Sequence, residues 1–540
     1  MKRISILWLC LMITFSGYGQ LDSDDCKTTV IQKKLSEFPL EVDLSTPMKS
    51  YLSREYAMWS GKQRLWHDIS TYQFSFDPNA PDREVSVERK EAILNQIVEE
   101  MVVYKESVAA VLTFDASNNY YLINLSRLED GKWVNAGQDL DNTLEACRAR
   151  LPLMMEYSYL RIPVISRVKQ KPTDTKPFVE YIRQKGIQPV DFVLGTLAEK
   201  KIVVYGEYHR RKVSWDLLKE VIRDPRFVAT TGTVFMELPS RMQPVMDEFF
   251  EQPIMEPELL LQIFREEQPH GWWDKGEYDF LIGLWELNST LPAAKKIQVR
   301  LVDFQIPYST LQSREEMDAF PDMNRNLHMA DVIEQYVKSS ADKRNHLFIV
   351  GCGHAYKSHV PGGASTPRGH KVELAAGAQL VERFSDEEVF TIFQHVVSGN
   401  NSGGNQQLIR HGYFDRAFAE AGNQPVAFQL KDSPFGEEPF DGLGDGMRFD
   451  PLTGTFADNF DSYIFMQPLK DEMHDYVLYE IFTDEFVEEM KRRAAYLGAS
   501  PEDRRWFGMK VQDMTAEGIK KVLWDFSEGK KRYPGEWFEF

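Results

Sequence analysis

The chain has 540 residues, a length that suggests more than one domain. Hydrophobic residues make up 43 % and charged residues 27 % of it, a composition typical of globular proteins. The 82 acidic residues outnumber the 63 basic ones, the net charge is −19, and no long block of Lys or Arg occurs. Because phosphate binding needs a basic face, this balance argues against a nucleic-acid partner.

The first twenty residues, "MKRISILWLCLMITFSGYGQ", form a separate segment. Lys2 and Arg3 precede an apolar stretch that ends at Phe15, and small residues follow up to Gly19. This order predicts a signal peptide over residues 1–19. The apolar stretch is too short to span a bilayer, and no later stretch is long and apolar enough to do so. We therefore expect an exported protein, periplasmic or secreted, with no membrane span after signal removal.

Residues 20–168 predict a small α+β module. The segment "ERKEAILNQIVEEMVVY", residues 88–104, has apolar residues at helical spacing. Three strand-like runs follow, separated by turn-forming residues: "VAAVLTFD", "YYLINLSRL" and "KWVNAGQ". One helix against a short antiparallel meander is similar to cystatin-like or NTF2-like modules. A polar, Pro-containing segment at residues 169–177 predicts a linker.

Three cysteines remain after signal removal. Cys26 and Cys147 both lie in the N-terminal third, and the sequence leaves open whether they pair in an oxidising compartment. Cys352 stands two residues before His354 and is a weak candidate nucleophile, because no second activating group is visible in the sequence.

From residue 178 onward, apolar strands alternate with amphipathic helices. The strand-like runs are "KIVVYGE", "TVFMELP", "IQVRLVDFQIP", "HLFIVGCGH" and "VFTIFQHVV". This alternation predicts an α/β fold with a mostly parallel sheet covered by helices on both faces. After residue 470 the pattern becomes helical, in "DEFVEEMKRRAAYL" and "AEGIKKVLWDF", which predicts a helical extension over residues 471–540.

Four successive strands of this sheet are followed by ionisable side chains: Glu207 and His209, then Glu237, Asp303 and His354. Ligands of such sheets bind at the carboxyl ends of the strands. A single polar residue there is unremarkable, but four in succession favour a site. Two of the strands end in the same Gly-x-x-His pattern, in which Gly permits a sharp exit and the imidazole turns over the sheet edge.

Arg325 adds a fifth group to the predicted site. It lies four residues before Met329, on the apolar stripe of the helix predicted over residues 323–337. Helices in such folds begin at the carboxyl edge of the sheet, so this Arg is expected to point toward the histidines. The alternative is a side chain that extends to solvent.

The order of these motifs resembles that of a known family. "VVYGEYH", "VFMELPS", "FLIGLWELN", "VRLVDFQIP", "RNLHMADVI" and "IVGCGHAYKSHVP" occur as in erythromycin-esterase-like proteins, which are similar to the haem-uptake and Tiki proteins with paired Gly-x-x-His motifs. The resemblance covers residues 175–470. It implies an α/β core and a catalytic site built from Glu207, His209, Glu237, Arg325 and His354. One departure is that only Tyr208 separates the first Glu and His, where the esterases have two residues.

Three functions are compatible with these residues. The first is hydrolysis of an ester or peptide bond, with His209 or His354 as general base, a Glu to orient it, and Arg325 to stabilise the oxyanion. The second is the same reaction with a divalent metal held by His209, His354 and Glu237. The third is haem or metal binding without catalysis, with Tyr208 and Tyr356 as further ligands.

The substrate is expected to be a small molecule or a peptide. Its specificity is expected to come from the aromatic-rich segments 240–290 and 355–372. The candidate substrate-binding residues are Asp303, Tyr208, Tyr356 and Trp272. The chain contains no G-x-S-x-G, H-E-x-x-H, C-x-x-C or Walker motif, which argues against the chemistries that these motifs serve.

The signal-peptide prediction can be checked directly. We expect the mature protein to begin near Gln20, because the small residues before it form the cleavage site. Mass spectrometry of the N-terminal peptide of protein recovered from the native host measures this. Soluble protein that retains Met1 would contradict the prediction.

Overall fold

The fold is given by a computed structural model of the chain. The described residues are 26–70, 82, 84–116, 120–141, 143–145, 147–148, 151, 155, 174–320, 324–357, 364–366, 369–371, 374–398, 407–438, 440, 455–504 and 506–533. The predicted signal peptide and most of the predicted linker lie outside these residues.

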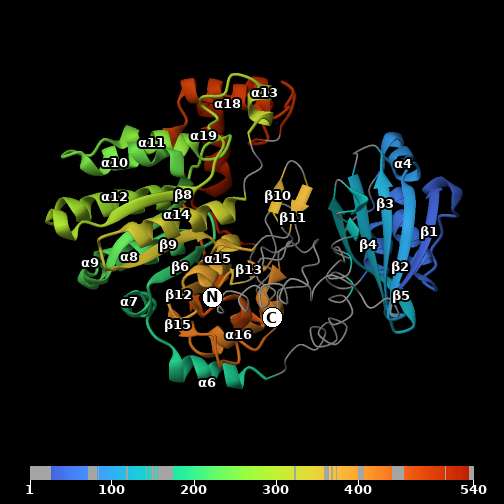
Figure 1. Cartoon of the computed structure of the whole chain (residues 1–540), viewed down its shortest axis with the longest axis horizontal. Helices are drawn as coiled ribbons and strands as arrows, with labels where there is room; N and C mark the ends of the chain where they lie inside the picture. Colours follow the sequence, from blue (N-terminus) through green and yellow to red (C-terminus); the bar gives the residue numbers. More distant parts are fainter. Residues whose placement is uncertain are drawn as a thin grey trace, which may run out of the picture.

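The N-terminal unit is a five-stranded antiparallel sheet whose strands pair in sequence order. Figure 1 shows it in blue beside the α/β unit. Cys147 belongs to a hydrophobic cluster of this unit, and the partly buried Cys26 packs against that cluster. Its strands and helices are β1 (Cys26–Lys34), α2 (Pro47–Ser60), α3 (Gln63–Asp68), α4 (Val87–Leu94), β2 (Ile97–Tyr104), β3 (Val108–Asp115), β4 (Tyr120–Glu129) and β5 (Lys132–Asp141).

The three predicted strands of this unit are present, but the predicted helix over residues 88–104 is wrong. Helix α4 ends at Leu94, and the rest of the segment forms strand β2, which pairs with both β1 and β3. The β-branched residues of β2 favour the strand, and pairing on both sides satisfies its backbone. The apolar residues of the two elements happen to continue one helical period, so periodicity alone could not place the break.

The α/β unit is built on a seven-stranded sheet of order β15–β16–β12–β6–β9–β7–β8. Every pair is parallel except β15 with β16, so the predicted mostly parallel sheet is confirmed. The strands are β6 (Ile202–Glu207), β7 (Thr231–Pro239), β8 (Gln298–Asp303), β9 (Asn345–Gly351), β12 (Val389–Gln394), β15 (Val426–Gln429) and β16 (Ser462–Phe465).

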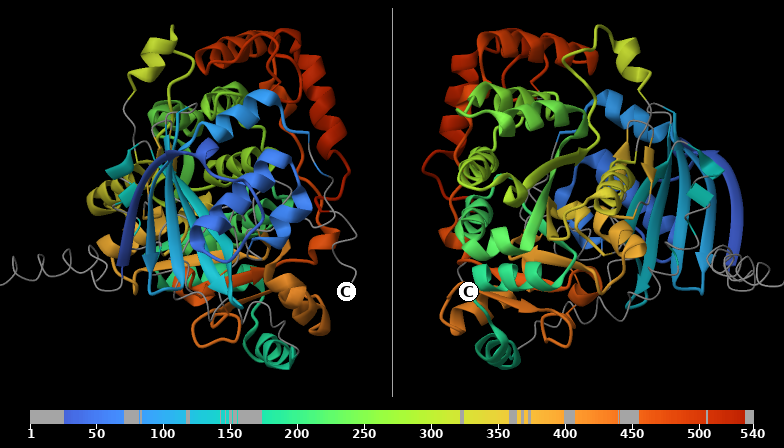
Figure 2. Two further views of the ribbon diagram at one scale, coloured as in Figure 1. Left: turned by 90° about the vertical axis from the view of Figure 1, so that its right-hand side faces the viewer. Right: turned by 60° about the vertical axis from the view of Figure 1, so that its left-hand side comes forward.

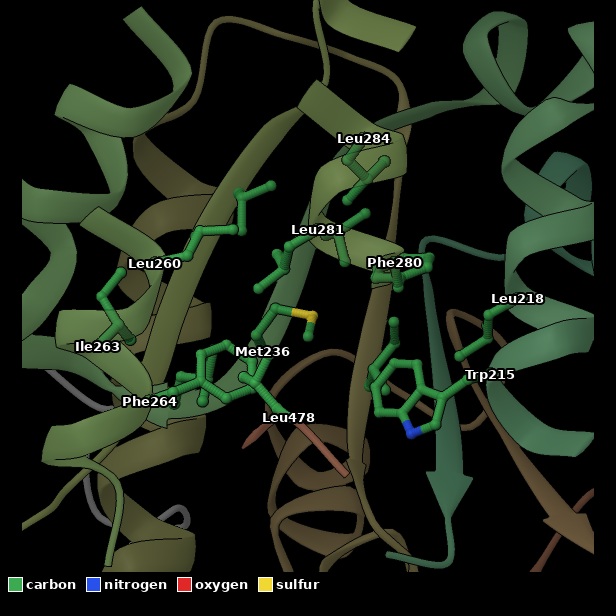
Figure 3. Packing of buried hydrophobic residues seen from close by; sticks show 14 of the residues in the cluster. Trp215, Leu218, Met236, Leu260, Ile263, Phe264, Phe280, Leu281, Leu284 and Leu478 are labelled. Carbon is green, nitrogen blue, oxygen red and sulfur yellow. The ribbon is translucent and has the colours of Figure 1, made fainter. Parts of the chain in front are cut away.

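Helices cover both faces of this sheet, as expected. Along β6, Val203 and Tyr205 face one hydrophobic cluster, and Ile202 and Val204 face the other. Figure 3 shows part of the first cluster, in which Trp215 and Met236 pack among side chains of α11 and α12. The helices are α6 (Lys176–Lys185), α7 (Pro189–Glu199), α8 (Lys212–Arg223), α9 (Pro225–Thr230), α10 (Gln243–Glu251), α11 (Pro257–Glu266), α12 (Lys275–Ser289), α13 (Arg314–Asp318), α14 (Arg325–Ser339), α15 (Ala376–Arg383), α16 (Tyr413–Glu420) and α17 (Phe456–Asn459).

Two short hairpins complete the described strands. Strand β10 (Ala364–Thr366) pairs with β11 (Gly369–Lys371), and β13 (Val397–Ser398) pairs with β14 (Gln407–Leu408). Both pairs are antiparallel and separate from the seven-stranded sheet.

The predicted C-terminal helices are present as α18 (Asp484–Tyr496) and α19 (Ala516–Ser527). Figure 2 shows them in red against the α/β unit. Met490 of α18 and Ile519 of α19 are fully buried and belong to the same cluster as Met236 of the central sheet. These helices therefore complete the first core. Within the described part of the chain, no helix has the length and apolarity needed to cross a bilayer.

Replacing Met490 with Ala tests whether the C-terminal helices stabilise the sheet. We expect Met490→Ala to lower the free energy of unfolding of the α/β unit by about 2–4 kcal/mol, because it leaves a cavity in the shared core. Trp524, which is 56 % exposed on α19, is the control, and Trp524→Ala should change the free energy by less than about 0.5 kcal/mol. Denaturant unfolding followed by fluorescence measures both, and equal effects would contradict the shared core.

Candidate active site

The predicted site residues meet at the carboxyl edge of the seven-stranded sheet. Strand β9 lies directly beside β6, with Glu207 opposite Gly351, so the two Gly-x-x-His motifs are on neighbouring strands. A cavity of about 90 Å³ opens there. Its lining residues are Glu207, His209, Trp215, Glu237, Glu267, Gln268, Trp272, Glu277, Arg325, Ile349, Val350 and His354. All five predicted catalytic residues are among them.

His209 is held by Glu207. Nδ1 of the imidazole is hydrogen bonded to Oε1 of Glu207, which is 5 % exposed at the end of β6. The ring also packs edge-on against Trp272, with 5.0 Å between ring centroids, while 45 % of the side chain stays exposed. Burial alone would lower the pKa of His209, but the carboxylates of Glu207 and Glu237 raise it to about 9. The ring is therefore oriented by one carboxylate and open on its other side.

Glu237, at the end of β7, connects three other groups of the site. Its Oε2 accepts a hydrogen bond of 2.6 Å from the backbone N–H of Gly351. Its Oε1 accepts a bond of 2.8 Å from Nη2 of Arg325 and lies 3.3 Å from Nε2 of His354. Burial would raise the pKa of this carboxyl, but His354, Arg325 and His209 together hold it well below its usual range. Glu237 is therefore a carboxylate at neutral pH.

Arg325 begins helix α14, whose N-cap is Asn324, and it points to the site as predicted. Its Nε donates a bond of 2.9 Å to Oδ1 of Asp303, and its Nη2 donates to Oδ2 of the same carboxylate. Burial would lower the pKa of Arg325, but Asp303 and Glu237 raise it above its ordinary value. Within the described residues, Nη1 donates no hydrogen bond, which leaves its two N–H groups for a ligand.

His354 is oriented by Asn326. The amide oxygen of Asn326 accepts a bond of 3.0 Å from the N–H of Ala376 and lies 2.7 Å from Nδ1 of His354. An amide oxygen can only accept, so Nδ1 carries the proton. Nε2 then faces Glu237, and this contact is a charge-assisted hydrogen bond whenever the ring is protonated.

The glycines of the two motifs are explained by close packing. A Cβ atom on Gly351 would lie 2.8 Å from Cε1 of His209 and 3.0 Å from Oε2 of Glu237. A Cβ on Gly206 would lie 3.0 Å from the carbonyl oxygen of Ile392 and 3.1 Å from Cβ of Ala355. The glycine of the second motif therefore makes room for the histidine of the first.

Two buried glutamates of the cavity were missed in the sequence. Burial and the neighbouring Asp303 raise the pKa of Glu267 to about 8. Burial, with Asp274 and Glu207 nearby, raises the pKa of Glu277 well above its ordinary value. Glu277 accepts a bond of 2.9 Å from the indole N–H of Trp272. Neither glutamate ends a strand, since Glu267 follows α11 and Glu277 lies in α12, so the pattern that marked the other residues could not reveal them.

The four predicted substrate-binding residues are placed differently. Trp272 lines the cavity as expected. Asp303 is fully buried and contacts Arg325, so it positions that side chain and does not face the cavity. Tyr208 faces the other side of the strand and packs on the second core. Tyr356 is fully buried against Phe460, with ring centroids 5.1 Å apart. The predictions for Tyr356 and Tyr208 therefore need correction, because alternation and core packing turn both away from the site.

Cys352 does not fit the predicted role of a nucleophile. It is buried, and burial raises the pKa of its thiol well above the ordinary value. A buried thiol that stays protonated is a poor nucleophile.

The predicted metal set does not fit a metal ion. Both oxygens of Glu237 already accept hydrogen bonds, and the positive charge of Arg325 lies 2.8 Å from Oε1. Nδ1 of His209 is bonded to Glu207, and Nε2 of His354 faces Glu237. Among the described residues, no group of three or more His, Cys, Asp and Glu is arranged to hold a metal. Tyr356, one of the ligands proposed for haem, is buried in the core and does not fit that role.

Comparison with known proteins finds matches only among solved structures. No family profile matches the chain, and no curated protein matches it. A mutant of the erythromycin esterase EreC in its open conformation is 11 % identical and covers 54 % of this chain and 99 % of its own, with a TM-score of 0.39. A Bacillus cereus protein is 11 % identical, covers 55 % and 98 %, and has a TM-score of 0.36. Haem-bound ChaN of Campylobacter jejuni is 12 % identical, covers 38 % and 86 %, and has a TM-score of 0.26.

Identities of 11–12 % say nothing about the chemistry of this chain, which has to be argued from its own site.

Substituting Gly351 tests the packing between the two motifs. We expect Gly351→Ala to displace the ring of His209 or the carboxylate of Glu237, because the new methyl group needs the space that both occupy. The pKa of His209 should then fall from about 9, since the ring moves away from the carboxylates that raise it. Exchange of the ring C2 hydrogen, followed by mass spectrometry across pH, measures this. Gly353→Ala, where an added Cβ meets no atom within 4 Å, is the control. An unchanged pKa in Gly351→Ala would contradict the packing.

Proposed function

We propose that the protein is a hydrolase of an ester or peptide bond, with His209 as its general base. The observation that carries this proposal is the orientation of His209 by Glu207 at the wall of a cavity that Arg325 and His354 also line. A nucleophile or base held by a second, buried group is the common arrangement in hydrolytic sites.

The reaction follows from the positions of these groups. The neutral imidazole of His209 removes a proton from water, and the resulting hydroxide attacks the carbonyl carbon of the substrate. Glu207 stabilises the imidazolium that forms, because its carboxylate already accepts a hydrogen bond from Nδ1. General-base catalysis of this kind contributes about 10²- to 10⁴-fold to the rate.

Arg325 is suited to stabilise the negative oxygen of the tetrahedral intermediate. Its Nε and Nη2 are fixed by Asp303 and Glu237, so the Nη1 group is held in place before substrate arrives. A preorganised donor of this kind contributes about 10²- to 10³-fold. The proton taken by His209 then passes to the leaving group as the carbon–oxygen or carbon–nitrogen bond breaks. His354, oriented by Asn326, holds Glu237 opposite Arg325.

We propose that the substrate is a small molecule or a peptide. The aromatic wall of Trp272 and Trp215 and the acidic residues Glu267 and Glu277 surround the place where it would lie. The predicted signal peptide supports an activity outside the cytoplasm, in the periplasm or the medium.

The pH profile of hydrolysis tests the role of His209. The base acts in its neutral form, so kcat/KM should rise about tenfold per pH unit and level off near pH 9, the pKa of His209. Glu207→Gln removes the charge that raises this pKa, so the rise should shift to lower pH. His209→Asn should lower kcat/KM by about 10²-fold or more at every pH. A panel of 4-nitrophenyl esters and fluorogenic peptides, assayed from pH 5 to 10, provides the measurement.

Two controls make this assay specific. Glu267 has a pKa of about 8 in the same range, so Glu267→Gln should leave the position of the rise unchanged if His209 causes it. Arg226, which is 51 % exposed in a surface ion pair, is the matched control for Arg325. Arg325→Gln should abolish most activity, and Arg226→Gln should not. A wild-type protein inactive on every probe, or His209→Asn with full activity, would refute the proposed function.

A further inference from the structure

The turn that carries His209 contains a backbone conformation that needs support. Arg210, the next residue, has a φ of +58°, in the left-handed region that residues with a side chain seldom adopt. Its N–H donates a bond of 3.0 Å to Oδ2 of Asp274, and its guanidinium lies 4.9 Å from the ring centroid of Trp273. Those contacts hold the N–H and the side chain of Arg210. Neither of them involves a carbonyl group of the turn.

Arg532, at the far end of the described chain, supplies those contacts. Its Nη2 donates a bond of 3.1 Å to the carbonyl oxygen of His209, and its Nη1 donates to the carbonyl oxygen of Arg210. The guanidinium lies 5.4 Å from the ring centroid of Tyr208 and 5.8 Å from that of Tyr533. One planar fork therefore holds two successive carbonyls of the turn, a geometry that the single ammonium of Lys cannot reproduce.

The segment that presents Arg532 is itself fixed to the same turn. The backbone N–H of Arg532 donates a bond of 2.9 Å to the carbonyl oxygen of Glu472. The carboxylate of Glu472 accepts hydrogen bonds from Arg211, and the two side chains are 1 % and 2 % exposed. The N–H of His474 donates to the carbonyl of Lys530 across the same pair of segments. Hydrogen bonds thus connect Arg211 to Glu472, Glu472 to Arg532, and Arg532 to the carbonyl of His209.

We propose that Arg532 is a positioning residue for His209, and that the C-terminal segment is thereby part of the active site. This inference rests on the proposed function for its effect on catalysis. The guanidinium binds backbone carbonyls and is not among the residues that line the cavity. Its loss should therefore lower kcat and leave KM nearly unchanged. A misplacement of a catalytic group by about 1 Å is enough to cost about 10²-fold in rate.

Three variants of the full-length protein test this inference. Arg532→Gln removes the charged fork, Arg532→Lys keeps the charge without the fork, and Lys531→Gln removes a charge from the neighbouring residue, which is 51 % exposed. We expect Arg532→Gln to speed amide hydrogen exchange of residues 208–211 at least tenfold and to lower kcat by about 10- to 100-fold, with KM within about twofold. Arg532→Lys should lie between wild type and Arg532→Gln, and Lys531→Gln should match wild type.

A readout independent of activity separates this inference from the proposed function. Loss of a positive charge near His209 would by itself raise the pKa of the imidazole. A loosened turn moves the ring away from Glu207 and lowers that pKa, so a fall in Arg532→Gln, followed by C2 hydrogen exchange of the ring, supports positioning. An unchanged or raised pKa, or unchanged exchange at residues 208–211, would overturn it. If the pKa falls while the wild type hydrolyses no probe, the proposed function fails and the positioning role stands.

Discussion

The carboxylate of Glu237 is the group on which the arrangement of the site depends. It accepts hydrogen bonds from the backbone of β9 at Gly351 and from the first turn of α14 at Arg325, and it lies 3.3 Å from Nε2 of His354. A carboxylate has about four lone-pair sites, and these three contacts occupy most of them. A buried carboxylate is costly unless it is paired in this way. The strand exit, the helix start and the second histidine are therefore fixed relative to one another by one side chain.

The charges of the cavity fall into two groups with different environments. Glu237 and Asp303 share Arg325, and these groups stay charged because each is paired. Among the described residues, Glu267 and Glu277 form no ion pair, and burial together with neighbouring carboxylates raises the pKa of both. Buried ion pairs of the first kind contribute little net stability, because desolvation offsets their attraction. These ion pairs instead hold hydrogen-bond donors in place before a substrate arrives, and the Nη1 group of Arg325 is such a donor.

Most of the central sheet could be predicted from the sequence, because a buried parallel strand and its covering helix each leave a clear period. The residues at the strand ends followed from that assignment, and four of them line one cavity together with Arg325. The order of the strands was not predictable, since no local sequence pattern indicates that β9 lies between β6 and β7. Local pattern also failed at residues 88–104, where long-range pairing of β2 replaced a helix. The predictions that Tyr208 and Tyr356 bind substrate failed for a related reason. Polarity and closeness in sequence do not determine whether a side chain at the carboxyl edge of the sheet faces the cavity or the core.

The residues of the site that the sequence did not reveal act through the backbone or through burial. Asp274 binds the N–H of Arg210, and Arg532 binds the carbonyls of His209 and Arg210. Such contacts need no particular spacing along the chain, and Arg532 is 323 residues away from His209. The repeated Gly-x-x-His pattern explains which groups reach the cavity and why glycine precedes them. It does not explain how a turn with a left-handed Arg210 keeps its shape. A chain with the same motifs but without this C-terminal segment would lose both donors, and the two carbonyls of its turn would bind water instead.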